Sequence, residues 1–87
     1  MAMLLSRGDS LFANGDVVSA RLFYERAAEA GHGQAALRLG ESYDPAFLAQ
    51  ARLYGIRSDL SAAVFWYRRA RELGLGEAEI LLQGRAP

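Results

Sequence analysis

Hydrophobic residues recur along the chain with the spacing of one helical face, and the same pattern is found twice. An apolar stripe at positions i, i+3, i+7 and i+10 is formed by Val17, Ala20, Tyr24 and Ala27. The equivalent stripe farther along the chain is formed by Leu60, Ala63, Tyr67 and Ala70. This spacing predicts two amphipathic α-helices, each with one buried face.

The two stripes belong to an internal repeat. When residues 16–37 are aligned with residues 59–80, nine of the 22 pairs are identical. Chance pairing in an alanine-rich chain gives roughly two or three identities, so we interpret the two segments as a duplication. The identical pairs are Asp16/Asp59, Ala20/Ala63, Tyr24/Tyr67, Arg26/Arg69, Ala27/Ala70, Glu29/Glu72, Gly31/Gly74, Gly33/Gly76 and Ala35/Ala78.

Each copy carries a helix start and a helix stop. Asp16 and Asp59 directly precede the stripes, where a short carboxylate accepts hydrogen bonds from the free N–H groups of the first turn. Gly31 and Gly74 follow the stripes, where a helix ends in the left-handed conformation that glycine adopts at little cost. Both copies are therefore predicted to form the same helix with the same ends.

Four further helices are expected around the two repeated ones. Asp44 followed by Pro45 favours a helix start, because proline is tolerated at the first helical position. Gly55 is the expected stop of that helix. The expected bounds of the four helices are Met3–Ala13, Gly33–Tyr43, Pro45–Tyr54 and Gly76–Gln83.

Composition supports an all-α fold and narrows the chemistry. Threonine is absent and only five residues are valine or isoleucine, which leaves little material for a sheet. All ten basic residues are arginine, a bias that indicates GC-rich bacterial coding. They balance ten acidic residues, so neither nucleic acid nor an anionic membrane is an expected partner. With no cysteine and one histidine, we expect no disulfide, no metal and no cofactor.

Residues at several positions of this pattern resemble tetratricopeptide-like repeats. Residues 3–31 are similar to a tetratricopeptide unit in the spacing of Gly8, Leu11, Ala20, Tyr24 and Ala27. Residues 20–43 are similar to the closely related Sel-one-like repeat, and residues 58–78 resemble a second copy that contains the string Trp66-Tyr67-Arg68-Arg69-Ala70. The family passes from its Leu-Gly-x-x-Tyr string to the next helix through a short loop, whereas here residues 44–51 intervene.

The resemblance implies a fold and a function. It implies an all-α, right-handed α–α superhelix of about two and a half helix pairs in a single domain, with units of about 3–31, 33–54 and 58–83. It also implies a scaffold that binds a peptide or a partner protein on a concave surface. The alternative is a docking or regulatory segment of a larger multidomain enzyme. Because such units need neighbours on both sides, we expect the chain to be a fragment of a longer protein.

The candidate catalytic residues have simpler interpretations. His32 lies at the start of a predicted helix, where we expect a structural or capping role, because no serine or aspartate is placed to make it a base. Alternating charges on a helix exterior are typical of a solvated face, which is the interpretation for Arg21, Glu25, Arg26 and Glu29 and for the basic cluster at residues 68–71. We therefore expect no enzyme activity of the chain itself.

The helical register predicts which side chains face a partner. If the helices at residues 3–13 and 33–43 line the groove, the residues opposite their core stripes are Leu5, Asp9, Phe12, Gln34, Leu37, Glu41 and Asp44. Leu5 and Phe12 would supply apolar contact, whereas Asp9 and Glu41 would select a basic partner. As exposed residues, Asp9 and Glu41 are expected to tolerate charge reversal without loss of stability.

Apolar residues at the two ends of the chain predict weak self-association. One set is Met3, Leu4 and Leu5, and the other is Ile80, Leu81 and Leu82. The first apolar run is too short for a signal peptide or a membrane span, which favours a cytoplasmic location. A periplasmic location stays open if a parent protein carries the signal.

Overall fold

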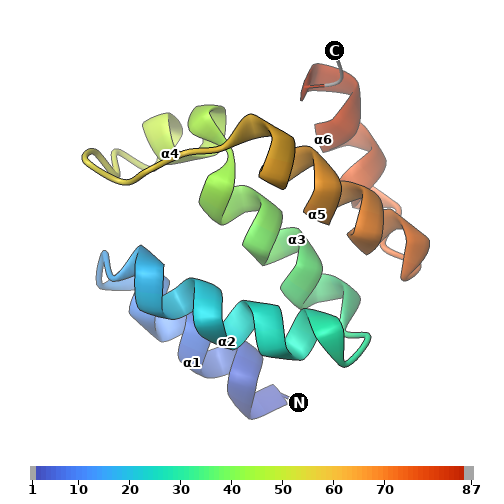
Figure 1. The fold of residues 1–87 in the computed structure, drawn as a ribbon, viewed down its shortest axis with the longest axis horizontal. Helices are drawn as coiled ribbons and strands as arrows, with labels where there is room; N and C mark the ends of the chain where they lie inside the picture. The colour runs from blue at the N-terminus through green and yellow to red at the C-terminus, as the bar shows by residue number, and fades with distance from the viewer. Residues whose placement is uncertain (1, 86–87) are drawn as a thin grey trace.

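Residues 2–85, the part of the chain described by the computed structural model, form six helices and no strand (Figure 1). The prediction of an all-α protein is confirmed. No helix within this range is both long and apolar enough to cross a membrane. The helices are α1 (Ala2–Ala13), α2 (Val17–Glu29), α3 (Gly33–Tyr43), α4 (Pro45–Gln50), α5 (Leu60–Glu72) and α6 (Glu77–Arg85).

The duplicated helices α2 and α5 begin and end as predicted. The Asp16 carboxylate accepts a hydrogen bond from the Ser19 N–H at 3.2 Å, and the Asp59 carboxylate accepts one from the Ala62 N–H at 3.0 Å. Gly31 and Gly74 have φ angles of 96° and 97°, in the left-handed region that favours glycine. The sequence duplication therefore produces duplicated helix ends.

Helix α4 is shorter than predicted. It ends at Gln50, four residues before the expected end at Tyr54, and Gly55 lies in the loop that follows. Arg52 adopts a left-handed φ of 58°, and the Leu53 N–H donates to the Leu48 carbonyl at 2.9 Å. This bond closes the helix with the geometry that glycine usually provides. The prediction that Gly55 ends this helix is therefore wrong, because the chain already leaves the helix at Arg52, which adopts the left-handed conformation.

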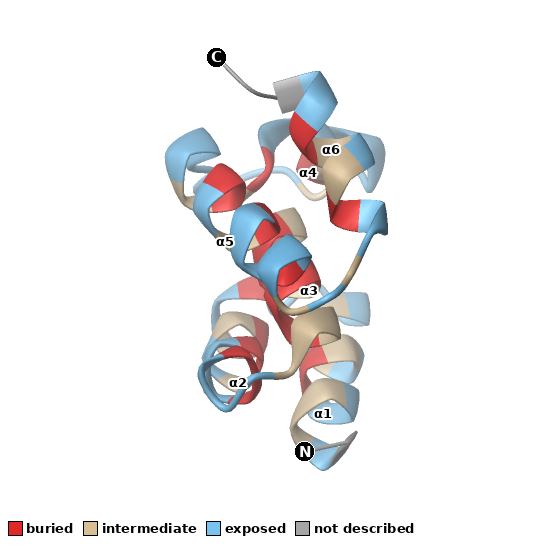
Figure 2. Ribbon diagram, turned by 90° about the vertical axis from the view of Figure 1, so that its right-hand side faces the viewer, coloured by how far each residue is buried: buried red, intermediate tan, exposed pale blue. Residues whose placement is uncertain are grey.

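Helices α1, α2, α3, α5 and α6 pack in chain order, each against the next. Helix α1 packs on α2, α2 on α3, α3 on α5 and α5 on α6, while α4 contacts α3. Helices α2 and α5 lie on one side of the molecule, α1 and α6 lie on the other, and α3 runs between them (Figure 2). The buried residues of α3 face neighbours on both sides, which makes it the central helix of the fold.

Each duplicated tyrosine packs against a glycine of the neighbouring helix. A Cβ atom added at Gly8 would lie 2.5 Å from Cε1 of Tyr24, and one added at Gly40 would lie 2.6 Å from Cδ1 of Tyr67. Both tyrosine side chains are buried. Glycine is therefore required at both positions for helices α1 and α3 to approach the rings.

The hydroxyl groups of the same tyrosines each donate to a carboxylate. The Tyr24 hydroxyl donates to Asp9 Oδ1 at 2.5 Å, and the Tyr67 hydroxyl donates to Asp44 Oδ2 at 2.7 Å. Asp44 also caps α4, since its Oδ1 accepts a hydrogen bond from the Ala46 N–H at 3.0 Å. The two tyrosine–carboxylate bonds give the buried hydroxyl groups an acceptor, without which their burial would cost free energy.

The interpretation of Arg21 as part of a solvated helix face is wrong. Its Nη2 donates to the backbone carbonyls of Ser42 and Arg57, at 2.5 Å and 2.7 Å. Its guanidinium carbon lies 4.0 Å from the centroid of the Tyr43 ring. Because these partners lie 21 and 36 residues away, the contact joins α2 to the end of α3 and to the loop before α5. No helical periodicity could have indicated a contact over that separation.

The glycine contacts predict a large effect of one added methyl group. Replacement of Gly8 or Gly40 by alanine should lower the free energy of unfolding by roughly 1–3 kcal/mol or more, because the methyl group would overlap a buried ring. The matched control is Gly84→Ala on α6, where a Cβ meets no atom within 4 Å, and a gain of up to about 0.5 kcal/mol is expected there. Urea unfolding followed by circular dichroism measures all three variants. Equal stability of Gly8→Ala and Gly84→Ala would contradict the proposed packing.

The strained end of α4 predicts a stabilising substitution. Arg52→Gly should raise the free energy of unfolding by about 1 kcal/mol, since glycine adopts the left-handed conformation without the clash of a Cβ atom. Ala49→Gly, an exposed substitution inside the same helix, should lower it by about 1 kcal/mol. Thermal unfolding of the two variants should therefore shift in opposite directions, and a shift in the same direction would refute the assigned conformation of Arg52.

Candidate functional site

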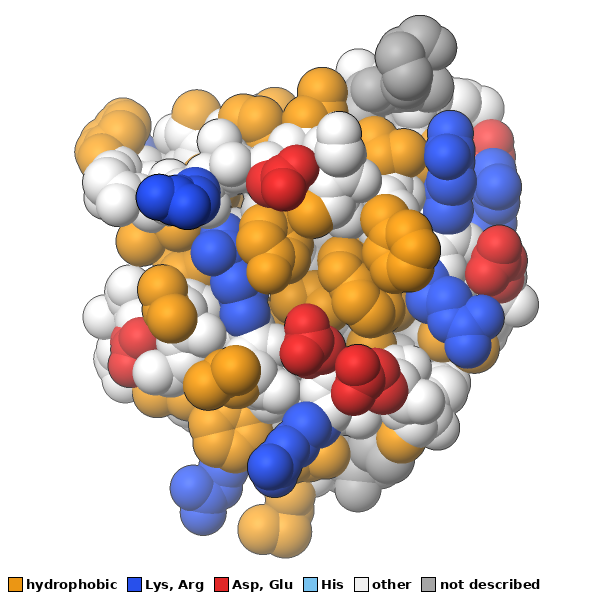
Figure 3. All heavy atoms as spheres, in the orientation of Figure 1, with side chains coloured by type: hydrophobic (Ala, Val, Ile, Leu, Met, Phe, Trp, Pro, Cys, Tyr) orange, Lys and Arg blue, Asp and Glu red, His pale blue; other side chains and the backbone are white. Residues whose placement is uncertain are grey.

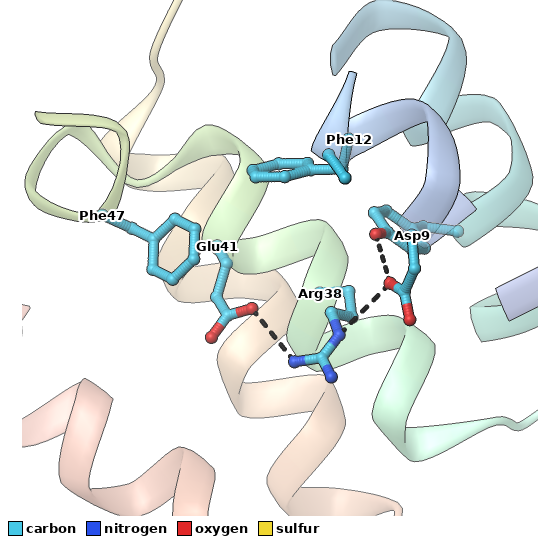
Figure 4. Close-up of a pocket in the computed structure, with 7 residues that line it drawn as sticks. Asp9, Phe12, Arg38, Glu41 and Phe47 are labelled. Carbon is cyan, nitrogen blue, oxygen red and sulfur yellow. Dashed lines mark hydrogen bonds and ion pairs between the residues drawn. The ribbon is translucent and has the colours of Figure 1, made fainter. Parts of the chain in front are cut away.

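A pocket of about 270 Å³ lies where helices α1, α3 and α4 meet (Figure 4). Helix α1 places its second half along one side, and α3 and α4 supply the other. Tyr24 of α2 also lines the pocket and connects it to the core. The lining residues are Asp9, Phe12, Ala13, Tyr24, Arg38, Glu41 and Phe47.

Two aromatic rings form the apolar part of the pocket. The ring centroids of Phe12 and Phe47 lie 5.9 Å apart with an interplanar angle of 62°, the edge-to-face arrangement that aromatic pairs favour. Phe12 belongs to α1, whereas Phe47 belongs to α4 in the segment that separates the two repeats. The pair therefore joins the first unit to this inserted segment, and its two rings lie beside the charged side chains (Figure 4).

A chain of charged and polar groups forms the other part. Arg38 Nε lies 3.3 Å from Asp9 Oδ1, and Arg38 Nη1 lies 3.5 Å from Glu41 Oε1. The Tyr24 hydroxyl donates to the same Asp9 oxygen. With both carboxylates ionised, one guanidinium between them leaves one net negative charge. The pocket is thus suited to a cationic or donor-rich group placed against aromatic rings.

Burial changes the acid–base behaviour of two of these residues. Burial raises the pKa of the Tyr24 hydroxyl, and its hydrogen bond to Asp9 raises it further, so the group stays protonated and acts as a donor. Burial also raises the pKa of Glu41, while the positive charge of Arg38 acts in the opposite direction. Only 15% of the Glu41 side chain is exposed, against 43% for Asp9.

Three of the seven predicted groove residues lie together in this pocket. Asp9, Phe12 and Glu41 come from helices α1 and α3, as the register predicted. Leu5 lies outside it and lines an adjacent open hollow together with Asp9. Gln34 is half-buried and is not one of the lining residues.

Two of the predicted groove residues are in the core, and their assignment to the groove is wrong. Leu37 is 2% exposed and packs in the main hydrophobic cluster. Asp44 is fully buried, where it accepts the Tyr67 hydroxyl and caps α4. The register error arose because α3 packs on α2 and on α5, so it has two buried sides instead of one.

The contacts of Asp9 and Glu41 argue against the expected tolerance of these residues to charge reversal. Reversal at Asp9 would remove the acceptor of a buried hydroxyl and place two positive charges beside each other. Reversal at Glu41 would likewise place a positive charge beside Arg38, at a side chain that is mostly buried. Both carboxylates contribute to the fold as well as to the pocket.

Sequence reasoning missed Arg38 and Phe47. Arg38 lies three residues before Glu41, a spacing that places the two side chains on one helical face, and this signal could have found it. Phe47 lies in the inserted segment, where no repeat provides a register, so only the fold could place it opposite Phe12.

The single histidine takes a structural position without capping the helix. His32 occupies the N-cap position of α3, as expected, but its side chain makes no capping hydrogen bond. It lines the same open hollow as Leu5. Within residues 2–85, no group of three or more histidine, cysteine, aspartate or glutamate residues is placed to hold a metal ion.

The raised pKa of Glu41 predicts a pH-dependent stability difference. A carboxyl group whose pKa is higher in the folded than in the unfolded chain binds more protons when folded, so stability falls as the pH rises from the ordinary value of 4.5 through the raised value. The free energy of unfolding of Glu41→Gln, taken relative to the unaltered protein, should therefore increase between acid and neutral pH. Glu25→Gln, at an exposed position of α2, is the control for the loss of one carboxylate. A difference for Glu41→Gln that is constant with pH would contradict this assignment.

Comparison of this chain with protein-family models, with curated proteins and with solved structures finds no match. The resemblance to Sel-one-like repeats therefore remains a prediction from the residues quoted above. The fold itself is an all-α domain of six helices over the described residues, in which two copies of one helix share their caps and their tyrosine–glycine contacts.

Proposed function

We propose that the chain is a protein-interaction module whose pocket at α1, α3 and α4 binds an arginine or lysine side chain of a partner peptide. The observation that carries this proposal is the pairing of one aromatic wall with two carboxylates that share a single guanidinium. The net negative charge favours a cation, and the phenylalanine rings favour the methylene stem that such a side chain carries.

The geometry of the pocket suits a contact at the surface of the domain. Phe12 and Phe47 are half-buried, so they present part of each ring to an incoming side chain. Asp9 remains 43% exposed, which leaves carboxylate surface beyond its bonds to Tyr24 and Arg38. A cation placed there would gain a charge-assisted hydrogen bond in an environment that is partly shielded from water.

The right-handed superhelical array is part of the same proposal. It is supported by the packing of α1, α2, α3, α5 and α6, each against the next, and by the repetition of caps and core contacts in α2 and α5. In an array of this kind the first helix of each pair lines the binding surface. Helices α1 and α3, which carry Asp9 and Glu41, would be those first helices.

An array of immobilised peptides tests this function. Peptides with arginine or lysine beside apolar residues should bind, and matched peptides with glutamine at the same position should bind less. Glu41→Gln and Phe47→Ala should each weaken binding by about tenfold, the size expected for a central contact.

The two control variants remove the same types of side chain, one glutamate and one phenylalanine, from positions outside the pocket. Glu25→Gln and Phe65→Ala alter exposed residues on α2 and α5, away from the pocket, and should leave peptide binding unchanged. Circular dichroism of every variant checks that the helices persist. Selection of acidic or neutral peptides, or full binding by Glu41→Gln and Phe47→Ala together, would refute the proposed function.

A further inference from the structure

The guanidinium group of Arg38 lies between the two carboxylates that line the pocket (Figure 4). Its Nε lies 3.3 Å from Asp9 Oδ1, and its Nη1 lies 3.5 Å from Glu41 Oε1. Strong charge-assisted hydrogen bonds are shorter, at about 2.7–2.9 Å, and the strongest arginine pairs join two nitrogens to two oxygens of one carboxylate. The side chain of Arg38 is also 37% exposed. Arg38 is therefore held only weakly between its two partners.

The position of Asp9 does not depend on Arg38 alone. The Tyr24 hydroxyl donates to the same Asp9 oxygen at 2.5 Å, a shorter contact than that of Arg38. Glu41 differs, because its side chain is mostly buried and Arg38 is its ion-pair partner. A carboxylate that is largely removed from water needs a counter-charge or a proton. Without Arg38 the pocket would therefore keep both carboxylates and would favour a cation more strongly.

The contacts of Arg38 also show which cation fits the pocket. One guanidinium reaches Asp9 and Glu41 at the same time, through two different nitrogens. A guanidinium carries five N–H donors in one plane, whereas the donors of a lysine ammonium all belong to one nitrogen. The planar group also stacks on aromatic rings such as those of Phe12 and Phe47. The spacing of the two carboxylates therefore suits an arginine better than a lysine.

An arginine of a partner has two advantages over Arg38 in this place. It is not attached to α3, so it can approach the carboxylates at the shorter distances of a strong pair. The rest of the partner would also cover the pocket and shield these ion pairs from water. Arg38 loses little when it leaves, because a partly exposed ion pair contributes little and its charge becomes hydrated again.

We propose that the pocket selects the guanidinium group of a partner arginine, which takes the place that Arg38 occupies in the free protein. Arg38 is then an internal competitor that lowers the apparent affinity for the partner. This inference rests on the proposed function, because it concerns the ligand and the control of the same pocket. It adds the choice of arginine over lysine, and it makes Arg38 a residue that the ligand displaces.

Two peptides test the choice of ligand. The acetylated pentapeptide Ala-Leu-Arg-Leu-Ala should bind the unaltered protein at least about fivefold more tightly than the same peptide with lysine at its centre. Isothermal titration calorimetry measures both dissociation constants. Equal binding of the two peptides, or tighter binding of the lysine peptide, would overturn the assignment to a guanidinium.

Substitution of Arg38 tests the exchange. Arg38→Gln removes the competitor and should tighten binding of the arginine peptide by about fivefold, the fold-change that corresponds to loss of a partly exposed ion pair. Arg38→Lys keeps the charge but offers one nitrogen to the two carboxylates, so its affinity should lie between those of the unaltered protein and of Arg38→Gln. If the ligand needed Arg38 as a contact, both substitutions would weaken binding instead.

Arg26→Gln separates the exchange from a change in net charge. Arg26 is exposed on α2 and does not line the pocket. Figure 3 shows side chains of both charge signs mixed over the face formed by α2 and α5. This control alters the net charge as Arg38→Gln does, and it should leave the affinity for the arginine peptide nearly unchanged. An equal gain in both variants would refute the exchange, and circular dichroism checks that each variant keeps its helices.

The same titrations distinguish failure of the exchange from failure of the proposed function. If neither peptide binds the unaltered protein or the Arg38 variants, both proposals are wrong. If the arginine peptide binds and the Arg38 variants bind it no more tightly, the exchange is wrong and the proposed function stands. Binding that is detected only in the Arg38 variants supports the exchange. The peptide comparison and Arg38→Lys keep the test valid if Arg38→Gln loses its helices.

Discussion

The close contact between a tyrosine ring and a glycine backbone is the constraint on which the rest of the structure depends. Tyr24 occupies the space beside Gly8, and Tyr67 occupies the space beside Gly40. Each pair sets how near two helices come, because any larger residue than glycine would push the ring away. Helix α3 carries one of the glycines and also packs on α2. The positions of both helix pairs relative to each other therefore depend on this central helix.

The polar end of each tyrosine connects this packing to the rest of the molecule. A buried phenol needs an acceptor, and the two acceptors are carboxylates with a second task. Asp44 caps α4 and so fixes the start of the inserted segment that carries Phe47. Asp9 binds Arg38 and so fixes the charged side of the pocket. The pocket is thus an outer extension of the same hydrogen bonds that stabilise the core.

Two surfaces with different chemistry result from this arrangement. The pocket combines aromatic rings with an excess of negative charge, which suits a cationic side chain. The face formed by α2 and α5 combines exposed apolar residues with both signs of charge. Of the residues that line the pocket, only Tyr24 belongs to the aligned repeat segments 16–37 and 59–80.

Local features of the sequence determined the helices, their caps and the duplicated core, since a helical stripe, an aspartate at its start and a glycine at its end act within a few residues. They also placed Asp9, Phe12 and Glu41 on one side of α1 and α3. Only the tertiary structure decided that Leu37 and Asp44 are buried, because α3 has two buried sides. It also decided that Arg21 joins α2 to residues 42 and 57, and that Phe47 faces Phe12. These contacts join residues far apart in the chain, and periodicity carries no information about which distant residues meet.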